Sequence, residues 1–485
     1  MRKGFLGSIM IMIVSTGWAW GQNSRPSEPG TSSVSSLEGE QPIDTRFQQT
    51  GFGEPNPITL PNVPVPAPPT MAGPSSGPVY PAPAIYQEVN PDTLPRPEEN
   101  ADRHEVERFW GSADYLYFFV KSQPSPYPML TTSIPSSGGV LNQPTTLPLF
   151  GQHDIQYNWM SGFRVDAGMY IDDWNRLGVD VGGFWLQKTD QKSTFQSDAA
   201  GNPLLAIPFI NAVTGAQDAV TLNSQGNFGG SSLIDTTTQV YSVDGNMIWN
   251  MYRGCATACK SLSLDALVGV RFAQLEESLT QISTSTFLGQ SGVPLPPSFG
   301  PFPASLGVDN GNGATLNILD KFHVLNQFYG GQIGLRSNFR WNRWLFNGTY
   351  KLGFGDMHST VDVFGNTTLT RGDSVPLTGS QLGGVYANAQ NISRLHRDTF
   401  SLLPEVNLKI GYQITEHVQI FVGYTFFYMN NVVRPGLVRP ITLQPGLIPI
   451  SPSYGQVVGV LPAINNFQTT DFYAQGVSFG FQFKY

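Results

Sequence analysis

Most residues that could do chemistry in this chain are charged side chains at alternate positions of segments whose other positions are apolar. In the stretch 160–172, Arg164 and Asp166 alternate with Phe163, Val165 and Ala167. Successive side chains of a strand point to opposite faces, so this spacing gathers both signs of charge on one face. The candidate charges are Arg164, Asp166, Asp180, Lys188, Asp244, Asp265, Arg271, Arg336, Lys351, Glu405 and Lys409.

Two kinds of chemistry suit these charges if their faces converge on one interior. Charges around a narrow passage would select solutes by sign. Alternatively, the charges would pair with one another, and the ion pairs and hydrogen bonds would fill the interior and hold its shape. The sequence slightly favours internal pairing, for a reason given by the strand count below.

A second group of residues could support hydrolysis. His153, Asp154, His358, His396 and Asp398 fall in or beside long predicted connections, and a hydrolase combines a nucleophile with a histidine and an acid from neighbouring strands or loops. No nucleophile motif on a strand-to-helix turn accompanies them. A loop-based hydrolase is therefore the less favoured alternative.

The only two cysteines, Cys255 and Cys259, are separated by three residues in a short connection. In an exported chain this spacing favours a local disulfide. A metal centre would need two further ligands, and neither a histidine nor another cysteine is close in sequence. We expect no metal and no other cofactor.

The elements that carry these residues are strands. From Phe109 onward the apolar pattern has a period of two, and ten segments reach the roughly 9–11 residues that a tilted membrane strand needs. The connections between them alternate long and short: 122–159, 173–176, 191–236, 253–261, 273–327, 341–343, 361–398, 415–417 and 430–470. Bacterial outer-membrane barrels combine an even strand number with short turns at one end and long loops at the other. The sequence predicts an all-β, transmembrane, antiparallel up-and-down barrel of about ten strands, with twelve as the alternative.

The final segment, 471–485, fits the closing strand of such a barrel. One face is small and polar, whereas the other is largely aromatic and is formed by Tyr473, Val477, Phe479, Phe481, Phe483 and Tyr485. We expect this face to contact outer-membrane lipid and to be recognised by the barrel-assembly machinery.

Strand number also bears on the interior. About eight strands leave an interior just filled by side chains, whereas open porins have about 16–18, so ten strands lie near the closed limit. A soluble β-sandwich also alternates, but it has no reason to segregate long from short connections in strict order.

The first 105 residues do not continue this pattern. Residues 1–21 have Arg2 and Lys3, a short apolar run and a small-x-small ending, which indicates a cleaved signal peptide. Positions 41–100 hold 15 of the 38 prolines, so we interpret 22–105 as a disordered Pro-rich periplasmic linker. The predicted barrel with its long extracellular loops occupies 106–485.

Several short segments resemble the bacterial Beta Barrel Porin-7 family. They are Arg108-Phe109-Trp110 with Ala113-Asp114-Tyr115-Leu116, Phe328-Tyr329-Gly330-Gly331-Gln332, Pro404-Glu405-Val406, Val432-Val433-Arg434-Pro435-Gly436, and Asp471-Phe472-Tyr473-Ala474-Gln475-Gly476. The resemblance covers about Arg108 to Tyr485. It implies an outer-membrane location and a barrel fold, and it brings no catalytic residues.

We therefore expect an integral outer-membrane protein with both termini in the periplasm. The leading hypothesis for its function is a narrow porin-like channel for small solutes. A structural or surface-interaction barrel without conductance is the alternative. The formal net charge is −8 and no segment is basic, so we expect no nucleic-acid partner.

Overall fold

A computed structural model of the chain describes residues 108–485 except positions 227, 258–259, 288–313, 371–377, 460 and 463–466. The predicted signal peptide, 1–21, and the predicted linker, 22–105, lie outside the described residues. No helix within the described ranges is both long enough and apolar enough to cross a membrane.

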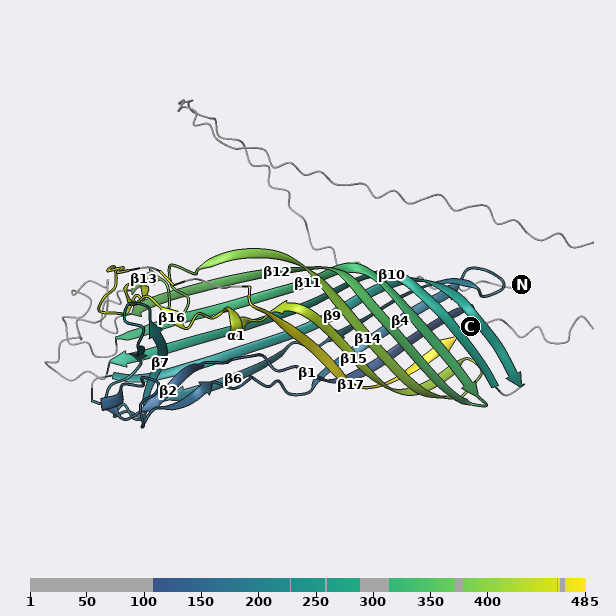
Figure 1. Ribbon diagram of the computed structural model, residues 1–485. Helices are drawn as coiled ribbons and strands as arrows, with labels where there is room; N and C mark the ends of the chain where they lie inside the picture. Colours follow the sequence, from purple (N-terminus) through teal and green to yellow (C-terminus); the bar gives the residue numbers. More distant parts are fainter. Residues whose placement is uncertain are drawn as a thin grey trace, which may run out of the picture. The chain divides into compact units, whose positions relative to one another are not determined.

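Ten antiparallel strands form a closed ring (Figure 1). Neighbours in the ring are also consecutive barrel strands, and the ring closes where the first strand pairs with the last, with Trp110 opposite Lys484. This arrangement confirms the predicted ten-stranded up-and-down barrel. The ring strands are β1 (Phe109–Val120), β4 (Met160–Tyr170), β5 (Leu177–Leu186), β9 (Phe228–Thr257), β10 (Lys260–Phe287), β11 (Thr315–Trp341), β12 (Trp344–Thr370), β14 (Ser393–Gln413), β15 (Val418–Val433) and β17 (Thr469–Lys484).

The short turns are built from residues that tolerate tight backbone geometry. Asn342, between β11 and β12, has a φ of 54°, in the left-handed region that asparagine adopts more readily than most residues. Between β4 and β5, the Asp172 carboxylate accepts the backbone N–H of Arg176 at 2.8 Å and that of Leu177 at 2.8 Å. Backbone hydrogen bonds join Phe109 to Tyr485, so the chain enters and leaves the ring at the short-turn end.

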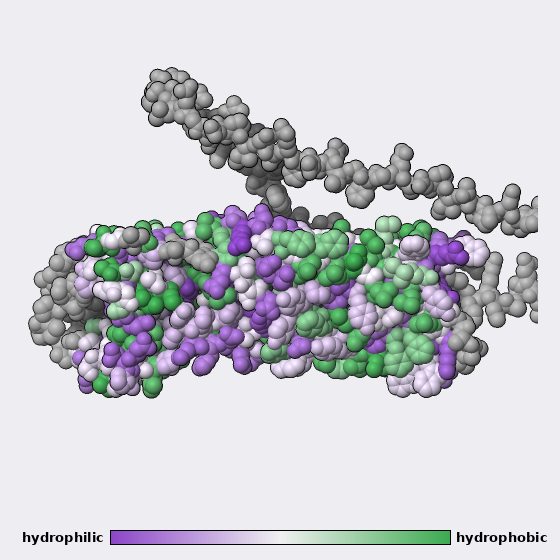
Figure 2. Space-filling model, viewed as in Figure 1, coloured by the Kyte–Doolittle hydropathy of each residue, from purple (hydrophilic) through white to green (hydrophobic). Residues whose placement is uncertain are grey.

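Near this end the strands are apolar outside and polar inside. On β10, Val268 and Val270 point outward and are 60% and 70% exposed, whereas Asp265 and Arg271 point inward and are buried. Figure 2 shows hydrophobic residues gathered on the outer surface toward the end of the barrel that carries the C-terminus. A lipid-facing band requires this pattern, because a charge on the lipid face costs about 2–4 kcal/mol at the bilayer midplane.

Farther along the long strands the two faces exchange character. Inward positions of β10 become apolar and buried at Leu275 and Leu279, while outward positions become polar at Ser278 and Thr280. As a result β9–β12 are 27–30 residues long, well beyond the predicted segments such as 262–272. The predicted strand ends were wrong there, because an apolar outward face marks only the membrane-spanning part of a strand.

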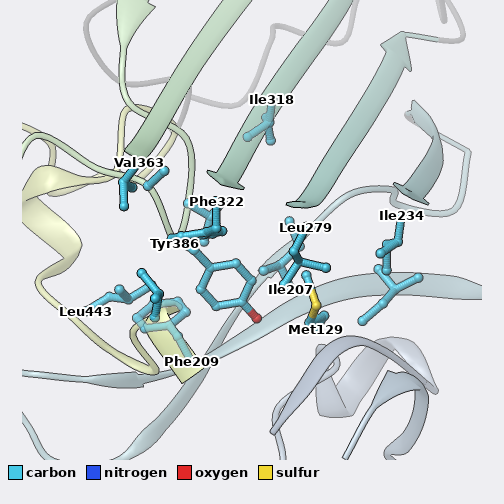
Figure 3. Close-up of a cluster of buried hydrophobic side chains, with 14 of the residues drawn as sticks. Met129, Ile207, Phe209, Ile234, Leu279, Ile318, Phe322, Val363, Tyr386 and Leu443 are labelled. Atoms are coloured by element: carbon cyan, nitrogen blue, oxygen red, sulfur yellow. The ribbon is translucent and has the colours of Figure 1, made fainter. Parts of the chain in front are cut away.

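The extended inner faces of β9–β12 are covered by a second, five-stranded sheet made from the long connections. It consists of β2 (Pro128–Ser133), β3 (Leu147–Gly151), β7 (Leu204–Asn211), β8 (Gln217–Thr221) and β16 (Thr442–Leu443). Between the two lies a buried apolar core (Figure 3), in which Phe322 and Leu279 from the ring pack with Met129, Ile207 and Phe209 from the covering sheet.

The other elements of the long connections extend this assembly. Two additional strands pair with long strands of the ring: β6 pairs with β9, and β13 pairs with β12. Short helical turns lie in the first and last long connections. These elements are β6 (Thr189–Gln196), β13 (Thr378–Leu382), α1 (Pro435–Val438) and the 3-10 turns Pro135–Ser137 and Pro445–Leu447.

Candidate functional site in the barrel interior

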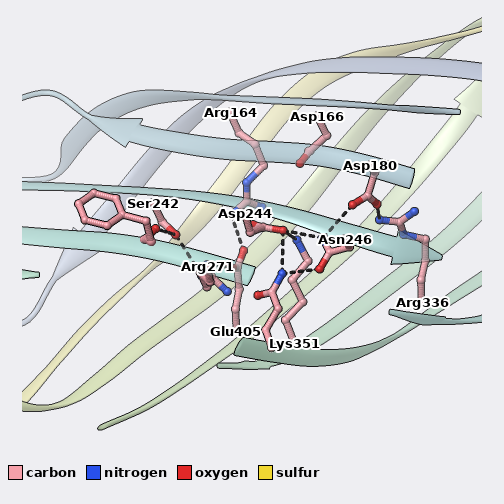
Figure 4. A network of polar contacts seen from close by, with 12 residues as sticks. Arg164, Asp166, Asp180, Ser242, Asp244, Asn246, Arg271, Arg336, Lys351 and Glu405 are labelled. Atoms are coloured by element: carbon pink, nitrogen blue, oxygen red, sulfur yellow. Dashed lines mark hydrogen bonds and ion pairs between the residues drawn. The ribbon is translucent and has the colours of Figure 1, made fainter. Parts of the chain in front are cut away.

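Strand alternation points the charged residues into the part of the barrel interior that lies toward the short-turn end. Glu405 of β14 forms ion pairs with two arginines, Arg164 of β4 at 2.7 Å and Arg271 of β10 (Figure 4). Arg271 Nε also donates to Ser242 Oγ at 3.0 Å, and Arg164 Nη1 donates to Thr425 Oγ1 at 3.2 Å. In the ring, β4, β10 and β14 are separated from one another by at least two intervening strands, so these ion pairs bridge the interior.

A second group of pairs lies beside the first. The Lys351 ammonium contacts the Asp244 carboxylate at 2.5 Å, and Arg336 pairs with Asp180. Asn246 joins the two pairs, because its Nδ2 donates to Asp244 Oδ2 and to Asp180 Oδ1, both at 2.8 Å. Each of these ion pairs again joins strands that are three places apart in the ring.

A third pair closes the set. Lys409 Nζ lies 2.7 Å from Asp114 Oδ2 and 4.1 Å from the centre of the Phe421 ring. Asp265 accepts a hydrogen bond from Asn250 at 2.5 Å, and Asp166 accepts one from Ser112 at 3.5 Å. The interior charges are thus largely satisfied by one another, which is the arrangement that the low dielectric of a barrel interior favours.

The structure brings together ten of the eleven predicted interior charges. Lys188 is the exception and corrects the prediction: β5 ends at Leu186, and Lys188 is exposed beyond it. The error arose because the alternation was extended past the end of the strand.

Further buried charged residues are not marked by the alternation. Asp114 is one, because β1 carries aromatic side chains at both odd and even positions, such as Tyr117 and Phe118, and its two faces cannot be told apart from the sequence. Arg434, in the last long connection, was missed because no alternation marks it. It pairs with Glu277 through Nε at 2.7 Å and Nη2 at 2.6 Å, and both side chains are fully buried.

The C-terminal strand and the two cysteines were the other predicted sites. The outward face of β17 is exposed at Val477, Phe479, Phe481 and Phe483, as it is at the C-terminal Tyr485, while Tyr473 is partly buried. Cys255 lies in β9 opposite Ser261. Cys259, and the side chains of both cysteines, lie outside the described residues, so the disulfide stays a prediction.

The candidate hydrolytic residues only partly converge. His358 Nδ1 contacts Asp398 Oδ1 at 2.5 Å, and the His358 and His396 rings stack with centroids 5.4 Å apart. These residues occupy the outward faces of β12 and β14. His153 and Asp154 lie apart from them, after β3. No cluster of three or more His, Cys, Asp or Glu residues able to hold a metal occurs in the part of the chain that the structure describes.

An apolar layer lies across the interior above the charges. Its members are buried, at most 4% exposed, and form one connected cluster to which all ten ring strands contribute. Phe184 and Phe427 pack edge to face at its centre, with ring centroids 5.1 Å apart. The apolar layer comprises Leu116, Phe118, Val120, Tyr157, Met160, Phe184, Leu186, Val240, Ala273, Leu275, Phe328, Met357, Leu403, Phe427, Met429, Val432, Phe472 and Ala474.

A cavity of about 550 Å³ occupies the interior between the charges and the short-turn end. We call it the short-turn cavity. The charges of Arg164, Glu405, Asp244 and Lys351 line its deep part, and Trp110 and Arg253 line it nearer the turns.

The closed ring, its lipid-facing band and its charged interior define a bacterial outer-membrane β-barrel. The chain belongs to the family described as Putative beta barrel porin-7, whose model matches residues 110–485. This match confirms the resemblance seen in the sequence. No match was found among curated proteins.

Two solved structures are similar to this chain at low identity. The outer membrane protease OmpT from Escherichia coli is similar with a TM-score of 0.33 and 9% identity, over 78% of this chain and 97% of that one. OmpT, an outer membrane protein of Vibrio cholerae, is similar with a TM-score of 0.14 and 7% identity, over 77% and 98% of the two chains.

Proposed function

We propose that this protein is a closed outer-membrane barrel that carries a structured extracellular sheet, rather than an open pore. The observation that carries the proposal is the apolar layer. A conducting path needs a continuous column of water, and buried apolar side chains from all ten strands form one cluster that includes Phe118, Phe184 and Phe427. A constriction lined by apolar side chains blocks ions by dewetting.

The covering sheet supplies a second support. The five-stranded sheet and the extended parts of β9–β12 share the core around Phe322 and Tyr386, and the Tyr386 hydroxyl donates to the Pro208 carbonyl at 2.8 Å. A packed sheet at the long-loop end is suited to a surface role such as interaction with other molecules outside the cell.

Short turns in the periplasm and long loops outside follow the usual orientation of such barrels, which puts both termini in the periplasm.

A narrow channel, the leading hypothesis from the sequence, is the second candidate. The charged short-turn cavity and the porin description of the family favour it. Conduction would then require the apolar layer to open. Hydrolysis is not part of either proposal, because the hydroxyl that contacts His396 belongs to Thr360, which is 4% exposed.

The C-terminal strand has a proposed role in assembly. Its outward aromatic face at Phe479, Phe481 and Phe483 is exposed on the barrel surface. We propose that this face contacts outer-membrane lipid and is read by the barrel-assembly machinery. No role in nucleic-acid binding is proposed.

Single-channel recording of the full chain in a planar bilayer tests the closed barrel. The wild type should insert without conductance steps. A variant with Phe118, Phe184 and Phe427 changed to alanine should conduct, because the apolar layer loses three rings at one level. The matched control changes three outward-facing, exposed phenylalanines of other strands, Phe163, Phe339 and Phe346, to alanine and should stay silent. Ion-selective steps from the wild type would reject the closed barrel and favour the channel.

A further inference from the structure

We propose that the short-turn cavity binds a small soluble anion that enters from the short-turn end. The inference rests on the closed lumen proposed above, which makes the cavity a pocket with a single entrance. A volume of about 550 Å³ lies within the range of roughly 300–1,000 Å³ that small-molecule sites occupy.

The cavity carries an excess of positive charge although the whole chain has a net charge of −8. Seven basic and four acidic side chains line it. The partners behind the lining are Arg271, Asp114 and Asp180. Including them gives eight basic against six acidic groups among the described residues, an excess of two.

The excess is greatest near the entrance. Arg253 of β9 and Arg340 of β11 line the cavity and are exposed. Arg253 stacks over the Tyr170 ring at 5.3 Å, and Arg340 Nε donates to the Asn342 carbonyl at 3.0 Å. Neither arginine forms an ion pair within the described part of the chain, so each guanidinium keeps donors for a ligand.

The surrounding turns do not change this excess. At the short-turn end the charges of Arg176, Lys260 and Arg343 balance those of Asp172, Asp173 and Glu416, so the attraction comes from the excess positive charge of the cavity itself. Low-dielectric walls focus the field of such charges and raise the local concentration of oppositely charged solutes. Arginine also matches carboxylate and phosphate groups by bidentate hydrogen bonding. These features favour a small solute with two or more carboxylate or phosphate groups.

Calorimetric titration of the folded full chain with citrate tests the site. The wild type should bind about one citrate per barrel, and affinity should fall as salt is raised because salt screens the interaction. The double variant Arg253→Gln/Arg340→Gln should bind on the order of tenfold more weakly, since two charges close to the ligand are lost. The control Arg343→Gln removes a nearby charge outside the cavity lining and should change affinity by less than about threefold.

Three outcomes would overturn the anion site: absence of citrate binding by the folded wild type, equal binding by the double variant, or an equal loss in the Arg343 control. Titration in nanodiscs of phosphatidylglycerol separates a soluble anion from a lipid headgroup. Loss of citrate binding there would assign the arginines to lipid and overturn the proposal.

Conductance of the same preparation separates this inference from the closed barrel. A silent barrel that fails to bind citrate overturns only the anion site. A conducting barrel that binds citrate overturns the closed lumen and supports the site.

Discussion

At the scale of single residues, Glu405 is the centre of the charged interior. Its carboxylate pairs with Arg164 and Arg271 from two other parts of the ring, and its side chain is only 7% exposed. The two arginines also stack over apolar-layer rings, Arg164 over Phe184 and Arg271 over Phe427, both at 5.4 Å. The bridge therefore fixes the base of the apolar layer as well as the distance between strands.

Glu405→Gln should destabilise the barrel by about 3 kcal/mol or more, because both buried arginines lose their countercharge. Denaturant unfolding of barrels refolded in liposomes measures this. The control is Asp173→Asn, whose carboxylate pairs with Arg108 at the surface with side chains 80% and 52% exposed, and it should cost under about 0.5 kcal/mol. Equal effects of the two changes would show that the interior pairs contribute no more than surface pairs.

Asp320, on the part of β11 beyond the membrane band, gives the core beneath the covering sheet a pH dependence. Burial raises its pKa to about 6, although backbone N–H groups of Val385 and Ala387 donate to its carboxylate at 3.2 Å and 2.7 Å. A carboxyl group in an unfolded chain has a pKa near 3.9. The folded state therefore binds the proton more tightly than the unfolded state does.

This difference predicts that the stabilising contribution of the protonated Asp320 is fully present below about pH 4 and is lost as pH rises through about 6. Hydrogen exchange of residues 383–392, measured from pH 4 to 7.5 and corrected for intrinsic rates, should show decreasing protection in the wild type. Asp320→Asn, which does not titrate, should remove this part of the pH dependence. If the protection of the wild type instead rose with pH relative to that of Asp320→Asn, the assignment would be contradicted.

At the scale of elements, each long strand changes its outward surroundings from lipid to water along its length. Val270→Asp on β10 should impair membrane insertion, because Val270 is 70% exposed in the lipid-facing band and a buried charge there is costly. Thr280→Asp, ten residues farther along the outward face, should insert normally. The fraction of heat-modifiable barrel on gels measures insertion, and equal insertion of the two variants would contradict the proposed membrane boundary.

The same exchange of faces limits what could be predicted about strand length. The sequence predicts the membrane-spanning part of β10 because Val268 and Val270 alternate with charged residues. The part of β10 farther from the short turns also alternates, since Leu275 and Leu279 alternate with Ser278 and Thr280. In that part, however, the apolar face is turned inward. An isolated sequence does not show which face meets a covering sheet contributed by distant connections.

At the scale of the whole molecule, the proposed orientation can be tested by labelling. With Cys255 and Cys259 replaced by serine, a cysteine at Ser453 in the last long connection should react with an impermeant maleimide on intact cells. A cysteine at Glu416 in a short turn should react only after the outer membrane is permeabilised. Both positions are exposed, so accessibility within the protein does not bias the comparison. The reverse pattern would invert the orientation.

The sequence by itself determined the barrel, its ten strands and most of the residues that point inward. Those features depend on local alternation and on the lengths of connections, which are written along the chain. Only the tertiary structure decided the pairing of Arg164 and Arg271 with Glu405, the inclusion of Asp114, and the assembly of the apolar layer in the interior. These contacts join strands far apart in sequence and at least three places apart in the ring, so their partners are set by ring closure and strand stagger rather than by any local pattern.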